Sequence, residues 1–152
     1  MTTLEKLAAN RVFAGLSPED LASVPDAGEV VRAGAGDRLI EEGQTNNHLF
    51  LVLDGAVEVR LLENPGRFSG VRLGIRDGGT CIGEYAFIDN KPASATVIAI
   101  EPSELFKISY KDLQTLLATD DTLGRTFYQN LLVHLVDRLR ATNAELDLFR
   151  PI

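Results

Sequence analysis

The spacing of hydrophobic and polar residues changes twice along the chain and divides it into three parts. Residues 1–27 show the period of about 3.6 that is typical of helices. Residues 28–109 contain short apolar runs separated by glycine turns, which is typical of strands. In residues 110–152 the helical period returns. We therefore expect one α+β domain over residues 1–152, with N-terminal helices, a central β region and C-terminal helices.

The N-terminal part is predicted to be helical over residues 3–24, with a break at Gly15. After the break, Ser17 and Pro18 form a helix start, because a hydroxyl caps free amide groups and proline favours the first helical position. Acidic residues follow in the first turn, where they interact favourably with the helix dipole. The sequence therefore predicts a short helix over residues 18–24.

The central part is predicted to be an antiparallel β-roll, also called a double-stranded β-helix or jelly roll. Turn signals recur about every eight to twelve residues, without the intervening helices of βαβ units. Asp54-Gly55 between two β-rich runs predicts a hairpin, and residues 63–70 predict a second hairpin loop. The strands are predicted over residues 29–32, 38–41, 48–53, 56–61, 71–76, 95–100 and 104–108.

The C-terminal part predicts a short helix over residues 110–118 and a long helix over residues 120–149. Apolar residues of the long helix alternate spacings of four and three, as in a coiled coil. We expect one face to pack on the β-roll and the other to pair two copies into a homodimer. The first stripe comprises Tyr128, Leu132, Leu135, Leu139, Thr142, Leu146 and Phe149, and the second comprises Phe127, Leu131 and Val136.

Composition and charge narrow the functional classes. Hydrophobic residues make up 45% and charged residues 24% of the chain, as in globular proteins. The net charge of −7 disfavours a nucleic-acid partner, because phosphates require clustered Lys and Arg. No run approaches the roughly 18 apolar residues of a membrane span, so we expect a cytoplasmic protein without a membrane partner. Cys81, the single cysteine, excludes an internal disulfide and is expected to be buried.

The most distinctive chemistry lies in CIGEYAFIDNKPASATV, residues 81–97. A Gly-Glu pair and a short apolar turn precede a Lys-Pro step, and an Ala-Ser-Ala-Thr run then enters a predicted strand. Glycine lets the backbone approach a ligand closely, and amide groups at a helix start attract anions. The segment has the outline of a phosphate-binding cassette, but it contains no arginine.

The cassette and the order of the predicted elements resemble the cyclic-nucleotide-binding domain of the catabolite-activator and protein-kinase-A regulatory-subunit superfamily. The matching stretches are residues 35–43, 49–59, 83–96 and 105–110. The resemblance covers nearly the whole chain, and it implies a stand-alone domain without a helix-turn-helix. It also implies cyclic AMP or cyclic GMP as the ligand, with no resident cofactor and no metal.

In that family the cassette supplies the ligand contacts, and the resemblance carries these roles to matching positions. Glu84 would accept hydrogen bonds from the ribose 2′-hydroxyl, and Ser94 would offer a hydroxyl or amide to the phosphate. Backbone atoms would form the remaining contacts with the phosphate. The candidate ligand-binding residues of the cassette are Gly83, Glu84, Tyr85, Ala86, Phe87, Lys91, Ala93, Ser94 and Ala95.

One position departs from the family pattern. Ala93 stands where the family places the arginine that pairs with the exocyclic phosphate oxygens. A hydrogen bond to a charged group contributes about 1.5–3 kcal/mol, or one to two decades of affinity. Lys91 in the same loop, and Arg72 and Arg76 on a neighbouring predicted strand, are candidates to replace this cation.

A second resemblance lies in the long helix. Residues 138–143 resemble the run with which the dimerisation helix of the bacterial activators places a Thr-Ser pair over the adenine. Thr142 and Asn143 are therefore candidate ligand residues. A polar residue that sets the register of a coiled coil explains Thr142 equally well.

Two functional interpretations remain. The chain is either a cyclic-nucleotide sensor that signals through its C-terminal helix, or a degenerate domain that binds no cyclic nucleotide and acts as a dimerising interaction module. Its acidic charge and the missing helix-turn-helix disfavour a transcription factor. We expect no enzyme, because the two histidines, His48 and His134, lie in different elements and provide neither a cupin-type metal site nor a Ser-His-Asp group.

Overall fold

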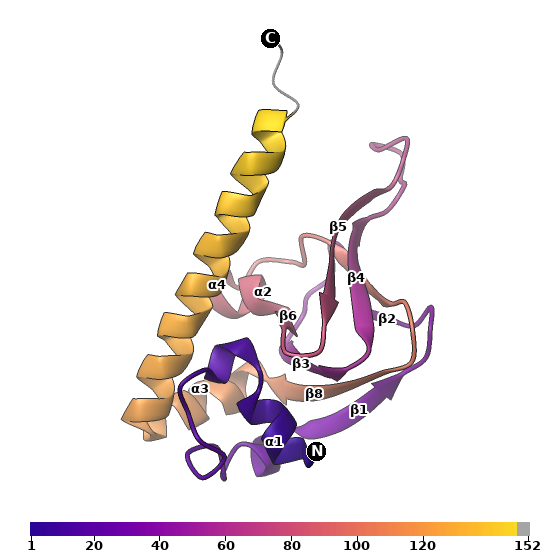
Figure 1. Cartoon of the computed structure of the whole chain (residues 1–152). Coiled ribbons are helices and arrows are strands. Elements are labelled where there is room, and N and C mark those ends of the chain that lie inside the picture. The colour runs from indigo at the N-terminus through magenta and orange to yellow at the C-terminus, as the bar shows by residue number, and fades with distance from the viewer. Residues whose placement is uncertain (149–152) are drawn as a thin grey trace.

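Two four-stranded antiparallel sheets form the centre of the computed structural model, which describes residues 1–148 (Figure 1). Every strand pair is antiparallel, and the sheets do not close into a barrel. The structure confirms the predicted β-roll. One sheet has the order β1 (Glu29–Ala33), β8 (Ser103–Ser109), β3 (His48–Asp54) and β6 (Cys81–Ile82), and the other has the order β2 (Arg38–Ile40), β7 (Thr96–Ala99), β4 (Ala56–Leu61) and β5 (Val71–Asp77).

Helices flank the β-roll at both ends of the sequence, as predicted. The long helix α4 (Asp121–Leu148) runs along one side of the β-roll and continues past it (Figure 1). Phe149, the last residue of the predicted seam, lies outside the described residues. The other helical elements are α1 (Thr3–Ala8), the 3-10 helices η1 (Arg11–Phe13) and η2 (Pro25–Ala27), α2 (Glu84–Asp89) and α3 (Tyr110–Thr119).

The buried apolar residues form two clusters, and α4 belongs to only one of them. The smaller cluster fills the space between the sheets and includes Val52, Val57 and Leu105. The larger cluster joins the helices to the outer face of the first sheet, and Phe127 and Leu131 of α4 are buried in it. This burial confirms that one face of α4 packs on the domain, because removing such side chains from water stabilises the contact.

The prediction of a helix over residues 18–24 is wrong. These residues form successive turns, in which the amides of Leu21 and Ala22 donate to carbonyl groups three residues earlier. Ser17 does cap the segment, because its hydroxyl accepts a hydrogen bond from the Asp20 amide at 3.2 Å. Pro25 follows and has no amide hydrogen to donate, so the segment is too short to nucleate a regular helix.

The predicted hairpin at Asp54-Gly55 is also wrong, although the turn is present. The strands on its two sides belong to different sheets, so Gly55 lies at a corner between the sheets. The backbone of Gly55 has a φ of 91°, and a Cβ atom there would lie 2.4 Å from the Ser103 hydroxyl oxygen. Both features require glycine at this position. The second predicted hairpin is confirmed, because β4 and β5 pair across residues 62–70 with Leu61 opposite Val71.

Some predictions concern single residues or whole-chain properties. Cys81 is buried, as predicted, and burial raises the pKa of its thiol. None of the helices in residues 1–148 is long and apolar enough to cross a membrane. Over the same residues no group of three or more His, Cys, Asp or Glu side chains is arranged to hold a metal ion.

Candidate functional site

The site begins at the turn between β6 and α2. Gly83 in this turn has a left-handed backbone with φ of 86°, and a Cβ atom there would lie 2.7 Å from the His48 carbonyl oxygen. Only glycine fits without displacing this neighbour. The Tyr110 hydroxyl donates a hydrogen bond to the Gly83 carbonyl, and Asn46 Nδ2 donates to the Tyr110 oxygen at 2.8 Å. These contacts fix the position at which α2 begins.

The protonation state of Tyr110 supports this arrangement. Burial raises the pKa of Tyr110 to about 12, although the hydrogen bond from Asn46 lowers it in part. The phenol therefore remains protonated at neutral pH and can donate to Gly83.

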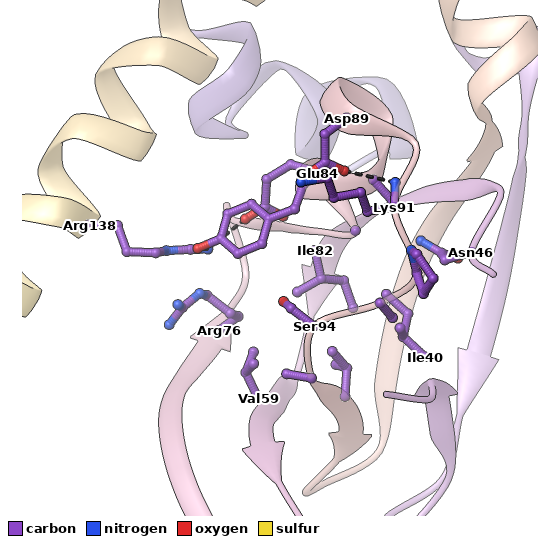
Figure 2. A pocket seen from close by; sticks show the side chains of 17 residues that line it. Ile40, Asn46, Val59, Arg76, Ile82, Glu84, Asp89, Lys91, Ser94 and Arg138 are labelled. Carbon is purple, nitrogen blue, oxygen red and sulfur yellow. Dashed lines mark hydrogen bonds and ion pairs between the residues drawn. The ribbon is translucent and has the colours of Figure 1, made fainter. Parts of the chain in front are cut away.

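A cavity of about 180 Å³ lies in front of α2 (Figure 2). Side chains of both sheets, α2, the loop 91–95 and one residue of α4 surround it. Two hydrogen bonds hold the loop, because the Gly43 amide donates to the Ala93 carbonyl at 2.8 Å and the Ala93 amide donates to the Gln44 carbonyl at 2.9 Å. The lining residues are Ile40, Asn46, Val59, Arg76, Ile82, Gly83, Glu84, Tyr85, Ala86, Asp89, Lys91, Pro92, Ala93, Ser94, Ala95, Val97 and Arg138.

Arg138 connects α4 to this cavity. Its Nη1 lies 2.6 Å from Glu84 Oε1 and 3.1 Å from the Tyr85 hydroxyl oxygen. The guanidinium carbon also lies 5.6 Å from the centre of the Tyr85 ring, which permits a cation–π interaction. The Glu84 side chain is only 5% exposed, so this ion pair is shielded from water. Burial alone would lower the pKa of Arg138, but the charge of Glu84 raises it above its ordinary value.

His134 supports Arg138 from one turn earlier in α4. Arg138 Nη2 lies 2.9 Å from His134 Nε2, and a guanidinium only donates hydrogen bonds, so Nε2 accepts. This geometry requires a neutral ring. Burial lowers the pKa of His134, and the like charge of Arg138 lowers it further, so the neutral form is favoured.

Arg76 enters the cavity from β5, and Figure 2 shows it beside Arg138. Its Nη1 donates to the Ile75 carbonyl at 3.1 Å, whereas its buried Nε has no hydrogen-bond partner among residues 1–148. Burial lowers the pKa of Arg76, and the charge of Arg138 has the same effect. The cavity therefore contains two neighbouring guanidinium groups, of which one is paired with a carboxylate.

The structure brings most of the predicted site residues together and leaves three outside the cavity. Phe87 points into the core, where it stacks on Tyr128 with ring centres 6.2 Å apart. Thr142 and Asn143 are exposed on α4 beyond the cavity. The predicted residues that line the cavity are Gly83, Glu84, Tyr85, Ala86, Lys91, Ala93, Ser94 and Ala95.

The three suggested replacements for the missing arginine are placed differently. Arg76 and Lys91 line the cavity. Arg72 does not line it, and its Nε lies 3.0 Å from Glu58 Oε1 on the neighbouring strand. Arg72 is therefore occupied by a carboxylate of the sheet.

The prediction from sequence missed Arg138 as a cavity residue. Its position contained a usable signal, because it lies four residues after His134 and four before Thr142. Residues at this spacing share one face of a helix. A search for a cation on the helix face that carries the predicted ligand residues would have found it.

The sequence is similar to parts of longer known proteins. Glutaminase 1 of Bradyrhizobium diazoefficiens is 28% identical over 143 residues, and the match covers 94% of this chain and 22% of that protein. The cAMP-dependent protein kinase regulatory subunit of Yarrowia lipolytica is 25% identical over 128 residues, covering 84% of this chain and 32% of that protein. The chain thus spans less than a third of the length of either relative.

Solved structures show the same architecture over most of the chain. A cyclic nucleotide-binding domain from Methylobacillus flagellatus superposes with a TM-score of 0.83 at 26% identity, covering 98% of this chain and 83% of that one. The Thermus thermophilus catabolite activator protein superposes with a TM-score of 0.78 at 25% identity, covering 92% of this chain and 63% of that one.

The family assignment rests on the central region. The family model described as the cyclic nucleotide-binding domain matches residues 30–120, which is more than half of the chain. Except for Glu29, the first residue of β1, this range contains all strands of both sheets, together with α2 and the loop 91–95. The chain belongs to the cyclic nucleotide-binding domain family.

Proposed function

We propose that the chain is a non-catalytic regulatory module that binds cyclic AMP or cyclic GMP in the cavity in front of α2 and signals through α4. The observation that carries this proposal is the ion pair between Arg138 and Glu84, with its 2.6 Å contact. It places a residue of the long helix directly on the carboxylate that the family resemblance assigns to the ribose. Ligand binding and the position of α4 are therefore linked through one contact.

The lining of the cavity suits a nucleotide. Apolar side chains of the sheets, such as Val59, Ile82 and Val97, offer a surface for a base. Glu84 accepts hydrogen bonds from hydroxyl groups when ionised, and Ser94 both donates and accepts. The cavity therefore offers both polar and apolar groups to a ligand that has both kinds of surface.

The size of the cavity suggests how ligand binding would change the position of α4. Its volume of about 180 Å³ is smaller than the roughly 300–1,000 Å³ of most small-molecule pockets. We infer that a bound nucleotide displaces Arg138 or Tyr85, which both line the cavity. A ligand that replaces the contact of Arg138 with Glu84 binds the displaced state more tightly and shifts the equilibrium towards it.

The relatives support a regulatory role for this domain. Their names include regulatory subunits of cAMP-dependent protein kinases, and the chain matches a part of each. We propose that the domain regulates an activity located elsewhere, in the same polypeptide or in a partner protein.

A dimerising interaction module without a nucleotide ligand is the second candidate. Ala93 in place of the family arginine favours it, and so does the outer face of α4. Leu132 and Leu139 are each 64% exposed there, and Leu146 is 65% exposed. Side chains of this size are seldom left in water as a contiguous stripe. We propose that this stripe pairs two copies of the chain, whether or not a nucleotide binds.

Calorimetry with cyclic AMP, cyclic GMP and cyclic dinucleotides tests the leading proposal, with 5′-AMP as the control ligand. A ligand at 100 times its Kd stabilises the folded state by about 2.7 kcal/mol, so the melting temperature provides an independent readout. We expect binding of a cyclic mononucleotide and a higher melting temperature. Absence of both effects at millimolar ligand would leave the interaction module as the function of this domain.

A further inference from the structure

Arg76 forms no ion pair with any residue in the part of the chain that the structure describes. It lies on β5, the edge strand of its sheet, and its side chain lines the cavity. Within residues 1–148 it forms no ion pair, and its buried Nε lacks a hydrogen-bond partner. Gly74, two residues earlier on the same face of β5, provides the room for it, because a Cβ atom there would lie 2.5 Å from Arg76 Nη1.

The charges around Arg76 do not include a carboxylate paired with it in the described part of the chain. The like charge of Arg138 acts unfavourably on Arg76, and Glu84, whose carboxylate acts favourably on it, is already paired with Arg138. A guanidinium stays protonated in proteins, so Arg76 cannot relieve this situation by losing its proton. A half-buried cation of this kind carries a desolvation cost that an anion entering the cavity would offset.

The other cations near the cavity are less suited to hold an anion inside it. Lys91 is exposed, and Figure 2 shows it on the opposite side of the cavity from Arg76 and Arg138. Lysine also provides a point charge, whereas the planar fork of arginine matches two oxygens of a phosphate. Arg72 is paired with Glu58 and does not line the cavity.

We propose that Arg76 binds the anionic group of the ligand, in the role of the arginine that position 93 lacks. The inference rests on the proposed function, and it specifies how this pocket holds its ligand. The phosphate then lies towards β5 and α4, at some distance from Lys91. Arg76 would direct one or both of its terminal nitrogens to the phosphate oxygens, and its charge would be balanced by the ligand.

The test compares Arg76→Gln with Arg72→Gln, which removes a guanidinium from the same strand outside the cavity. Calorimetry measures the affinities of both variants and the wild type for cyclic AMP, cyclic GMP, adenosine and guanosine. We expect Arg76→Gln to weaken binding of the cyclic nucleotides by about 10- to 100-fold and to leave the nucleosides, which have no phosphate, unaffected. Arg76→Lys should lose less, and Arg72→Gln should bind like the wild type.

A second measurement separates this inference from the proposed function. Thermal unfolding in inorganic phosphate, against chloride of equal ionic strength, reports an anion site whether or not a nucleotide binds. If no cyclic nucleotide binds but phosphate stabilises the wild type and not Arg76→Gln, the proposed function fails and the role of Arg76 stands. If cyclic nucleotides bind Arg76→Gln as tightly as wild type, or if nucleosides lose affinity equally, the role of Arg76 is refuted. A wild-type chain that responds to neither ligand refutes both proposals.

Discussion

Arg138 of α4 and Glu84 of α2 form an ion pair with a 2.6 Å contact, although they lie 54 residues apart in the sequence. This pair and the contact of Arg138 with the Tyr85 hydroxyl are direct polar links between the long helix and the cavity. It also joins the two parts of the molecule that the proposed function requires to move relative to each other.

Replacing Glu84 tests the contribution of this pair to stability. Glu84→Gln removes the carboxylate and leaves the partly buried Arg138 with a neutral partner. We expect the free energy of unfolding to fall by about 1.5–3 kcal/mol, since hydrogen bonds to charged groups contribute that much. Urea unfolding measures the change, and Glu63→Gln in the exposed loop 62–70 serves as the control. Equal stabilities of the two variants would show that the pair contributes nothing.

Replacing Ala93 tests whether the cavity lacks only a cation on its loop side. Ala93→Arg should strengthen binding of cyclic AMP or cyclic GMP by about 10- to 100-fold, because a guanidinium there adds a charged hydrogen bond to the phosphate. Adding Glu84→Ala should weaken binding again by removing the ribose acceptor. Calorimetry gives both values, and Ala93→Gln controls for side-chain size. A folded Ala93→Arg chain that binds neither nucleotide at millimolar concentration would contradict the sensor function.

The backbone at Gly83 gives a prediction about local strain. Gly83→Ala combines an unfavourable φ of 86° with a Cβ atom 2.7 Å from the His48 carbonyl oxygen. Gly15→Ala has a similar φ of 91° but no atom within 4 Å of the added Cβ. We expect both variants to be destabilised and Gly83→Ala to lose about 1–3 kcal/mol more. Chemical denaturation of the pair isolates the steric effect, and equal losses would argue against it.

The histidines predict how stability depends on pH. Burial lowers the pKa of His134, helped by Arg138, and burial also lowers the pKa of His48, helped by Lys107. The unfolded chain therefore takes up protons on these rings near pH 6.5, whereas the folded chain takes them up only at lower pH. Stability from the two rings is thus present above about pH 6.5 and decreases as the pH falls. Unfolding at pH 7.5, 6.5 and 5.5 should show this decrease.

Substitution of each histidine shows how much its ring contributes to the pH dependence of stability. His134→Gln and His48→Gln should each flatten the dependence over this range, and the double variant should flatten it most. If His134→Gln retains the full wild-type slope, the ring of His134 is not held neutral by its surroundings.

The exposed apolar stripe of α4 predicts a homodimer, and charged side chains introduced into the stripe should disrupt it. Leu132→Glu with Leu139→Glu should convert a dimer to a monomer, because two carboxylates would be buried without partners. Light scattering at tens of micromolar measures the mass. Gln129→Glu with Ala144→Glu adds the same charge away from the stripe and should remain dimeric. A monomeric wild type would contradict the prediction.

The fold was largely predictable from the sequence because its strands and helices have clear local periods. Local signals were less informative about pairing. Asp54-Gly55 correctly indicated a turn, but whether the flanking strands pair depends on contacts with distant strands such as β8. Residues 18–24 follow a good helix-start signal, but the segment before Pro25 is too short to form a regular helix.

Site residues that are neighbours in the sequence were predictable. Site residues that reach the cavity through the packing of a distant helix were harder to predict. Gly83 and Glu84 follow from the cassette, because neighbouring residues on one turn stay together. Which α4 side chains reach the cavity depends on the rotation of α4 about its axis, and this rotation is set by the burial of Phe127 and Leu131. Arg138 therefore faces the cavity, whereas Thr142 does not line it.

The length of α4 turns a small rearrangement at the cavity into a larger one at a distance. Asn130 ties the first half of the helix to the carbonyl groups of Val12 and Ala14, and Arg138 is held by Glu84. Beyond Arg138 the helix continues to Leu148 with exposed side chains, a length of roughly 15 Å at about 1.5 Å per residue. A tilt of about 10° at Arg138 displaces the end by roughly 3 Å. If the proposed function holds, the last ten residues of α4 would act as a lever arm that pivots at Arg138.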